Sequence, residues 1–155
     1  MKYAVNKLKR IIGIIVGGFV LILLGIMISI PFVNDHVAKK TAKVIEKIEL
    51  PEHTEYMESF WKAGKLVGNG NGMQYLGGIL IKSELSADEL QTYYAQYANE
   101  EWECIVEKQA GTGIQFIEHG NLSLDTNVMG NDYYIVYSWG HNDFVFFSEL
   151  DLRGH

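Results

Sequence analysis

The sequence predicts an α+β domain that follows a transmembrane helix, and three observations lead to this fold class. Residues 11–30 form an uninterrupted run without a charged side chain, most of them large and apolar. Residues 86–89, Ser-Ala-Asp-Glu, have the pattern of a helix capping box. Stretches on both sides of that helix alternate between apolar and polar residues, which is typical of strands. After the anchor and a helical stalk, the predicted order is β-β-α-β-β-β-β, a small antiparallel sheet with one packed helix.

The apolar run is long enough to cross a membrane. Its twenty residues would extend about 30 Å as a helix, which matches the hydrocarbon core of a bilayer. We therefore expect a transmembrane helix over residues 11–33, with the bilayer as its partner. A cleaved signal peptide is the alternative, but its apolar region is usually about 7–15 residues long and a small-residue cleavage motif follows it. No such motif follows this run, so the sequence favours an uncleaved anchor.

The charges that flank the run predict its orientation. Residues 1–10 carry four basic side chains and no acidic one, so we expect a cytoplasmic tail and an extracytoplasmic C-terminal domain at the cell membrane. The four lysines of residues 39–47 compete with this tail, although acidic residues lie among them.

The chain beyond residue 50 is strongly acidic. Sixteen Asp and Glu residues outnumber five Lys and Arg residues there, giving a net charge of −11, whereas the whole chain carries −6. Nucleic acids bind through basic side chains that neutralise phosphates, so we expect no nucleic-acid partner. A cationic partner is compatible with this charge, and so is the simpler interpretation that the charge keeps the domain soluble.

A helical stalk is expected over residues 34–50. Apolar residues recur there at helical spacing, with lysines on the opposite side. Asn34 or Asp35 can cap this helix, and Pro51 ends it. The stalk can also continue the membrane helix after a kink near Pro31. The acidic α+β domain is then expected to occupy residues 51–155.

The first half of that domain contains a hairpin and a helix. Residues 54–67 are ambiguous, and a strand is favoured over a helical start. Gly-Asn-Gly-Asn-Gly follows, in which Asn-Gly pairs supply the positive φ angles of hairpin turns, and residues 73–81 are the expected return strand. The capping box then begins a helix that runs to about residue 98. The face expected to pack on the sheet consists of Leu90, Tyr93, Tyr94 and Tyr97.

The second half of the domain is expected to be β-structure. Residues 119–132 are loop-like, apart from a short strand at residues 122–124. A last hairpin is expected across residues 140–143. The four strands of this half are expected at residues 102–107, 114–118, 133–139 and 144–147.

The hairpin loop is a candidate recognition site, because it is flexible and rich in amide groups. A phosphate-binding loop is excluded, since no Lys-Ser or Lys-Thr follows the glycines and no βαβ unit surrounds them. The candidate loop comprises Gly68, Asn69, Gly70, Asn71 and Gly72.

Small residues in the apolar run permit a second helix to approach closely. Gly13 with Gly17, and Gly25 with Ser29, are small-x-x-x-small pairs, so a homo-oligomer through the membrane helix is an additional expectation. The aromatic residues offer another candidate surface. All three Trp and eight of the nine Tyr lie beyond residue 50, where they form either an exposed recognition patch or an aromatic core.

No catalytic or metal-binding motif is visible in the sequence. No histidine pair has i, i+4 spacing, and neither an H-E-x-x-H motif, a cysteine pair nor a G-x-S-x-G motif occurs. We therefore expect no metal, no cofactor and no enzymatic activity, with a small hydrolase as an alternative. Cys104 is expected to be a buried, unreactive thiol. The residues weighed for a metal or catalytic site are His119, His141, Asp143, Asp151 and His155.

Three stretches carry a resemblance to known sequences. Residues 63–75 (AGKLVGNGNGMQY), 81–90 (IKSELSADEL) and 151–155 (DLRGH) look like a group of short, uncharacterised single-pass membrane proteins of Clostridia and related Firmicutes. The resemblance spans most of the domain, implies a Gram-positive source and brings no activity or ligand. We expect an extracytoplasmic binding or accessory module that recognises a protein or envelope component. An immunity or inhibitor protein against a cationic toxin or envelope hydrolase is the alternative.

Overall fold

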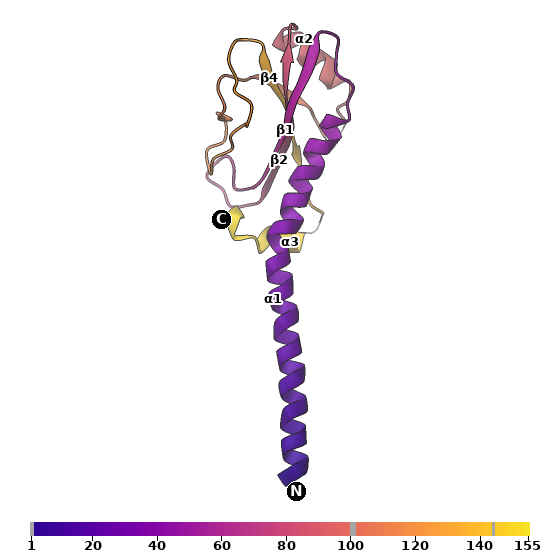
Figure 1. Ribbon diagram of the computed structural model, residues 1–155, viewed down its shortest axis with the longest axis vertical. Coiled ribbons are helices and arrows are strands. Elements are labelled where there is room, and N and C mark those ends of the chain that lie inside the picture. Colours follow the sequence, from indigo (N-terminus) through magenta and orange to yellow (C-terminus); the bar gives the residue numbers. More distant parts are fainter. Residues whose placement is uncertain (1, 100–101, 144) are drawn as a thin grey trace.

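A single long helix runs from the N-terminus into the folded domain (Figure 1). The computed structural model describes residues 2–99, 102–143 and 145–155. The α+β class is confirmed, because the helix is followed by a small antiparallel sheet and short helices. The elements are α1 (Lys2–Glu46), β1 (Thr54–Gly64), β2 (Gln74–Ser83), α2 (Ala87–Ala95), β3 (Ile105–Lys108), β4 (Tyr133–Gly140), α3 (Val145–Glu149) and the 3-10 helix η1 (Leu152–Gly154).

The N-terminal half of α1 projects away from the domain (Figure 1). Residues 6–28 are exposed throughout, although most of their side chains are apolar. The helix contains a segment that is long and apolar enough to cross a membrane, judged by length and composition. An exposed apolar surface of this extent fits a single-pass membrane protein.

The C-terminal half of α1 belongs to the folded domain and is not a separate stalk. Ala38, Ala42 and Ile45 are buried, and the helix packs against β1, β2 and β4. The helix also continues through Pro31, so Asn34 lies inside it and does not cap a second helix. Residues 34–46, which the sequence assigned to a stalk before the domain of residues 51–155, therefore pack with that domain. The sequence pattern showed an apolar stripe correctly but did not reveal the surface that covers it.

The sheet has four antiparallel strands in the order β1-β2-β4-β3. The hairpin between β1 and β2 is confirmed, and the strand assignment for residues 54–67 holds for Thr54–Gly64. Residues 65–73 connect these strands in a loop wider than a tight Asn-Gly turn, in which Gly68 and Gly72 have positive φ angles. The carboxamide of Gln74 holds the start of this loop by accepting from the Leu66 and Val67 amides.

The sheet is covered on both faces. On one face, Ile79, Ile81 and Val136 pack with Ile45 of α1 and with the Leu90 and Tyr94 side chains of α2. The expected packing of the α2 stripe on the sheet is thereby confirmed for Leu90, Tyr93 and Tyr94, whereas Tyr97 is exposed. On the other face the long connection between β3 and β4 folds back over the strands, and it contributes apolar side chains to a second core. This second core comprises Phe60, Leu66, Leu76, Leu80, Ile114, Leu124, Val128, Tyr133, Ile135 and Tyr137.

Two glycines let α1 lie close against the sheet. A Cβ atom added to Gly77 of β2 would lie 2.6 Å from the Ala38 carbonyl oxygen and even closer to the Ala42 amide nitrogen. A Cβ atom added to Gly140 of β4 would overlap the Thr41 hydroxyl. Because real side chains do not tolerate such contacts, glycine at these positions determines how near the helix can approach.

The capping box at the start of α2 is present as the sequence predicts. The Ser86 hydroxyl accepts from the Glu89 amide at 3.3 Å, and the Glu89 carboxylate accepts from the Ser86 amide at 2.8 Å. These bonds satisfy two amide groups that would otherwise lack a partner in the first turn. The helix ends at Ala95, three residues before the expected end at about residue 98.

We expect Ser86→Ala to lower the free energy of unfolding by about 1 kcal/mol, because it removes the cap. The measurement is chemical unfolding of the full chain in mild detergent, followed by tryptophan fluorescence. Ser123→Ala, at an exposed position, is the control and should change stability by less than about 0.5 kcal/mol. Equal effects of the two substitutions would contradict the role of the cap.

The last predicted hairpin is wrong, because residues 145–149 form helix α3. Residue 144, the first of the expected strand, lies outside the described residues. Short apolar runs do not distinguish strand from helix by periodicity. Here β4 lies between β2 and β3, so both of its edges are already paired and a following strand has no place beside it. The strands expected at residues 114–118 and 122–124 are also absent, apart from an isolated bridge between Gly113 and Ser123. Ile114 and Leu124 pack onto the sheet face instead.

Candidate functional site

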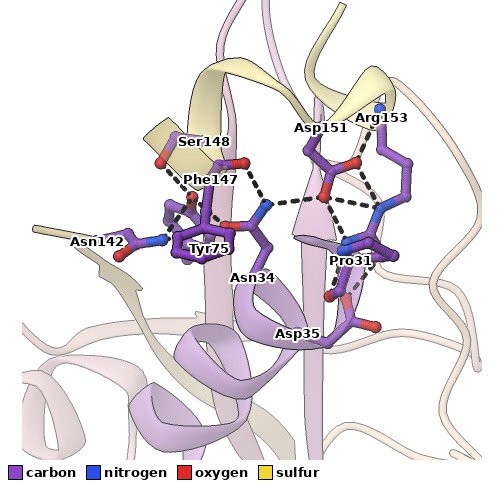
Figure 2. A network of polar contacts seen from close by, with 9 residues as sticks. All are labelled: Pro31, Asn34, Asp35, Tyr75, Asn142, Phe147, Ser148, Asp151 and Arg153. Carbon is purple, nitrogen blue, oxygen red and sulfur yellow. Dashed lines mark hydrogen bonds and ion pairs between the residues drawn. The ribbon is translucent and has the colours of Figure 1, made fainter. Parts of the chain in front are cut away.

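A polar network fixes the C-terminal segment, residues 145–154, to α1 (Figure 2). At its centre, Asn34 is fully buried and uses every polar position of its side chain. Its Nδ2 donates to the Phe147 carbonyl at 2.9 Å and to Asp151 Oδ2 at 2.8 Å. Its Oδ1 accepts from the Tyr75 hydroxyl at 2.9 Å and from Asn142 Nδ2 at 3.0 Å. Four separate segments of the chain therefore meet at one side chain.

An ion-pair cluster continues the network. Arg153 donates to Asp151 at 2.7 Å and to Asp35 at 2.7 Å, and it also donates to the Pro31 carbonyl at 3.1 Å. Burial raises the pKa of Asp151, but the hydrogen bonds from Arg153 and Asn34 outweigh this effect and hold the pKa below its usual value. The carboxylates of Asp151 and Asp35 in turn raise the pKa of Arg153, against the opposite effect of burial. The C-terminal segment is thus fastened to the part of α1 where its apolar run ends.

Beside this network, two adjoining hollows form a groove along α1. The lower hollow, which is nearer the apolar run of α1, has a volume of about 460 Å³ and lies between residues 29–40 of α1 and residues 141–143. The upper hollow, farther from the apolar run, has a volume of about 410 Å³ and extends to Tyr97, Asn99 and Trp102 after α2. The two share Val37, Lys40, His141 and Asp143. We call these two adjoining hollows together the α1 groove.

The groove changes in character along its length. Its lower end is lined by Phe32 and Val33, which close the apolar run of α1. Its upper end is lined by the rings of Tyr97, Trp102 and Trp139. The α1 groove therefore offers apolar surface at the level where the apolar run ends and aromatic surface farther up.

Polar groups lie between these two ends. Lys40 and the facing pair His141 and Asp143 line both hollows, and His141 Nε2 lies 3.7 Å from Asp143 Oδ1. Both side chains of this pair are almost fully exposed, so the pair contributes little to stability. An elongated ligand with apolar, polar and aromatic contacts suits this arrangement.

Most of the groove was not predicted from the sequence, because residues 34–50 were assigned to a stalk outside the domain. The spacing of the residues along this helix would have been enough to separate its two faces. Asn34, Ala38 and Ile45 face the sheet, whereas Val33, Val37, Lys40 and Val44 line the groove. The aromatic residues are partly in the core, where Tyr94 is buried, and partly at the surface, where Tyr97 is 41% exposed. A role of the exposed rings in recognition stays a prediction.

The other sequence-based candidate sites lie apart from the groove. The loop of Gly68–Gly72 is exposed at the end of the domain from which α1 projects, and Gly72 donates to the Gly154 carbonyl at 2.7 Å. Its role in recognition stays a prediction. In α1, Gly13, Gly17 and Gly25 have open space around their Cα atoms, and the Ser29 hydroxyl donates to the Ile26 carbonyl. Self-association through these residues also stays a prediction.

The residues weighed for metal binding or catalysis are not brought together. His119 Nε2 lies 2.8 Å from the Gly68 carbonyl oxygen, and His155 Nε2 lies 3.0 Å from the Glu149 carbonyl oxygen. Asp151 is occupied by Arg153, so only His141 and Asp143 are neighbours. Among residues 2–99, 102–143 and 145–155, no three His, Cys, Asp or Glu side chains are grouped to hold a metal ion.

Cys104 is buried beneath α2, as the sequence predicts. Burial raises the pKa of its thiol to about 12. Because the thiolate is the reactive form, this thiol is expected to react slowly with alkylating reagents. Cysteines introduced at exposed positions can therefore be labelled selectively.

No protein-family model matches the chain, and no curated protein or solved structure matches it. The resemblance to Firmicutes membrane proteins stays a prediction.

Proposed function

We propose that this chain is a single-pass, membrane-anchored accessory module of a Gram-positive bacterium, which binds a partner protein through the α1 groove. The N-terminal tail is cytoplasmic and the domain is extracytoplasmic. The basic residues of the tail support this orientation, and the exposed apolar half of α1 supports the anchor. The groove is the observation that carries the proposal, because it begins where the apolar run ends.

The shape and lining of the groove favour an amphipathic segment of another membrane protein as the partner. Such a segment, close to its own membrane span, lies at the same height as the groove. Its apolar residues would contact Phe32, Val33 and Val37, and its polar residues would meet Lys40 and Asp143. Recognition of an amphipathic segment in an apolar groove is a common binding mode, in which a few side chains at helical spacing act as anchors.

The proposal is tested by photocrosslinking in intact cells of the source organism. A photoreactive residue replaces Val44 in the upper groove or, as a control, Tyr56 on β1, which has similar exposure. We expect a discrete protein adduct from position 44 and none from position 56. A lipid adduct at position 44, or no adduct at all, would contradict the choice of a protein partner.

Filling the groove provides the second arm of the test. Lys40→Trp places a large ring where the two hollows meet, and we expect it to weaken the adduct from position 44 about tenfold, equivalent to about 1.4 kcal/mol of binding free energy. Lys39→Trp is the matched control, because Lys39 is also exposed but does not line the groove. Equal adducts in the two variants would show that the contact does not use the groove.

The charge of the domain favours one further candidate, an inhibitor that binds a cationic toxin or hydrolase. Its net charge of −11 beyond residue 50 suits such a partner. An open hollow of about 380 Å³ at the membrane-distal end of the domain is lined by Glu55, Glu84 and Asp132, and also by His53 and by Lys82, which pairs with Asp132. A photoreactive residue at position 84 would capture a cationic partner if this candidate is correct, and position 44 would not.

A further inference from the structure

In the C-terminal segment, residues 145–154, Ser148 and Asp151 turn inward, whereas four apolar side chains are exposed and Phe147 is partly buried. The Ser148 hydroxyl lies 2.8 Å from the Tyr75 hydroxyl, and the Asp151 side chain is 4% exposed and bonded to Asn34. The apolar side chains show the opposite pattern. Helix α3 has no buried residue. The exposed fractions are 59% for Val145, 56% for Phe146, 39% for Leu150 and 84% for Leu152.

The C-terminal segment lies at the end of the domain from which the N-terminal half of α1 projects (Figure 1). Its position along α1 is set by the polar network, because Asn34 binds the Phe147 carbonyl and Arg153 binds the Pro31 carbonyl. Both contacts occur at the end of the apolar run. On α1 itself, Phe32 is 70% exposed at the same level. The exposed apolar side chains of the segment therefore lie near the level at which the exposed apolar surface of α1 ends.

We propose that the C-terminal segment is a second membrane contact, which inserts Val145, Phe146, Leu150 and Leu152 into the interfacial region of the outer leaflet beside α1. The inference rests on the membrane anchor of the proposed function. Apolar side chains on a short element bind at the boundary between headgroups and acyl chains, while charged groups remain at the aqueous side. Exposed Glu149 and the ion pair of Arg153 with Asp35 suit that aqueous side.

A lipid surface fits this segment better than a protein partner does. The segment cannot move far from the bilayer, because the polar network ties it to the first turns of α1 beyond the apolar run. Any partner that covers it must therefore occupy the space next to an apolar helix surface, and lipid fills that space around a single span. Two contacts with the bilayer instead of one would fix the tilt of the domain. The α1 groove would then be held at a constant height relative to the bilayer.

The test uses the full chain in vesicles of phosphatidylcholine and phosphatidylglycerol. A fluorescent probe is attached to Phe146→Cys or Leu152→Cys, with Val145→Cys as a further position if either variant misfolds. Glu84→Cys at the membrane-distal end is the negative control, and Leu21→Cys in the apolar run is the positive control. Cys104 is buried and should remain unlabelled. Lipids with a spin label close to the headgroup or close to the end of the acyl chain act as quenchers.

We expect both segment probes to be blue-shifted and quenched more strongly by the shallow label than by the deep one. The probe at position 21 should show the opposite preference, and the probe at position 84 should not be quenched. If position 21 is quenched but the segment probes are not, the second contact is wrong and the anchor stands. If no position is quenched, the anchor and the second contact both fail. Segment probes that are shielded from a water-soluble quencher without being quenched by lipid would indicate a protein partner and overturn the inference.

Discussion

Gly77→Val is expected to lower the free energy of unfolding of the domain by about 3 kcal/mol or more, at the upper end of the cost of overpacking. The first atom of the new side chain would already overlap the α1 backbone at Ala38 and Ala42. Backbone atoms in a packed helix cannot rotate away as a flexible side chain does, so the helix must move off the sheet. This movement would also strain the contacts of Ile45 with Ile79 and Ile81.

The effect is measured by chemical unfolding of the full chain in mild detergent, with tryptophan fluorescence as the signal. Gly70→Val is the matched control, because Gly70 has no neighbouring atom within 4 Å and its φ angle is not positive. It should change the free energy of unfolding by less than about 0.5 kcal/mol. If Gly77→Val were as mild as the control, the close packing of α1 on the sheet would be wrong.

The features that the sequence predicts well are those with local causes. The capping box identifies the start of α2 because both of its hydrogen bonds join residues three positions apart. The first hairpin follows in the same way from turn residues between two apolar stretches. The packed half of α1 has no such local signal, since its partner is a sheet that comes later in the chain. The adjacent glycines Gly77 and Gly78 within a strand were the available clue, because glycine in a strand often marks a close backbone approach.

The C-terminal segment shows a different limit of sequence analysis. An apolar stretch after β4 resembles a strand, and only the order of strands shows that β4 has no free edge. The groove is hidden for a related reason. Its walls come from α1, from the end of β4 and from the residues after α2, which no local pattern joins. Asn34 was a partial clue, because an amide side chain at a helical position next to an apolar run needs hydrogen-bond partners if it is buried.

Asp151→Ala is expected to lower the free energy of unfolding by about 2 kcal/mol or more at neutral pH. The substitution leaves the buried Asn34 Nδ2 with one partner fewer and removes the main partner of Arg153. Breaking a buried ion pair typically costs about 3–5 kcal/mol, but Arg153 is 39% exposed and water can replace part of the lost interaction. Asp143→Ala, at a carboxylate that is 92% exposed, should change stability by less than about 0.5 kcal/mol.

The effect of Asp151→Ala on the free energy of unfolding depends on pH, and the sign of this dependence follows from the lowered pKa of Asp151. A carboxyl group with a lower pKa in the folded state than in the unfolded chain stabilises the fold at any pH above the unfolded value, which is about 4. That contribution is lost as the pH falls through the folded pKa. The difference in unfolding free energy between the wild type and Asp151→Ala should therefore be constant from about pH 5 to pH 7 and should shrink below about pH 4. Unfolding curves recorded across this range measure the difference directly, and a gap that widens in acid would show that Asp151 is not held in its ionised form by Arg153 and Asn34.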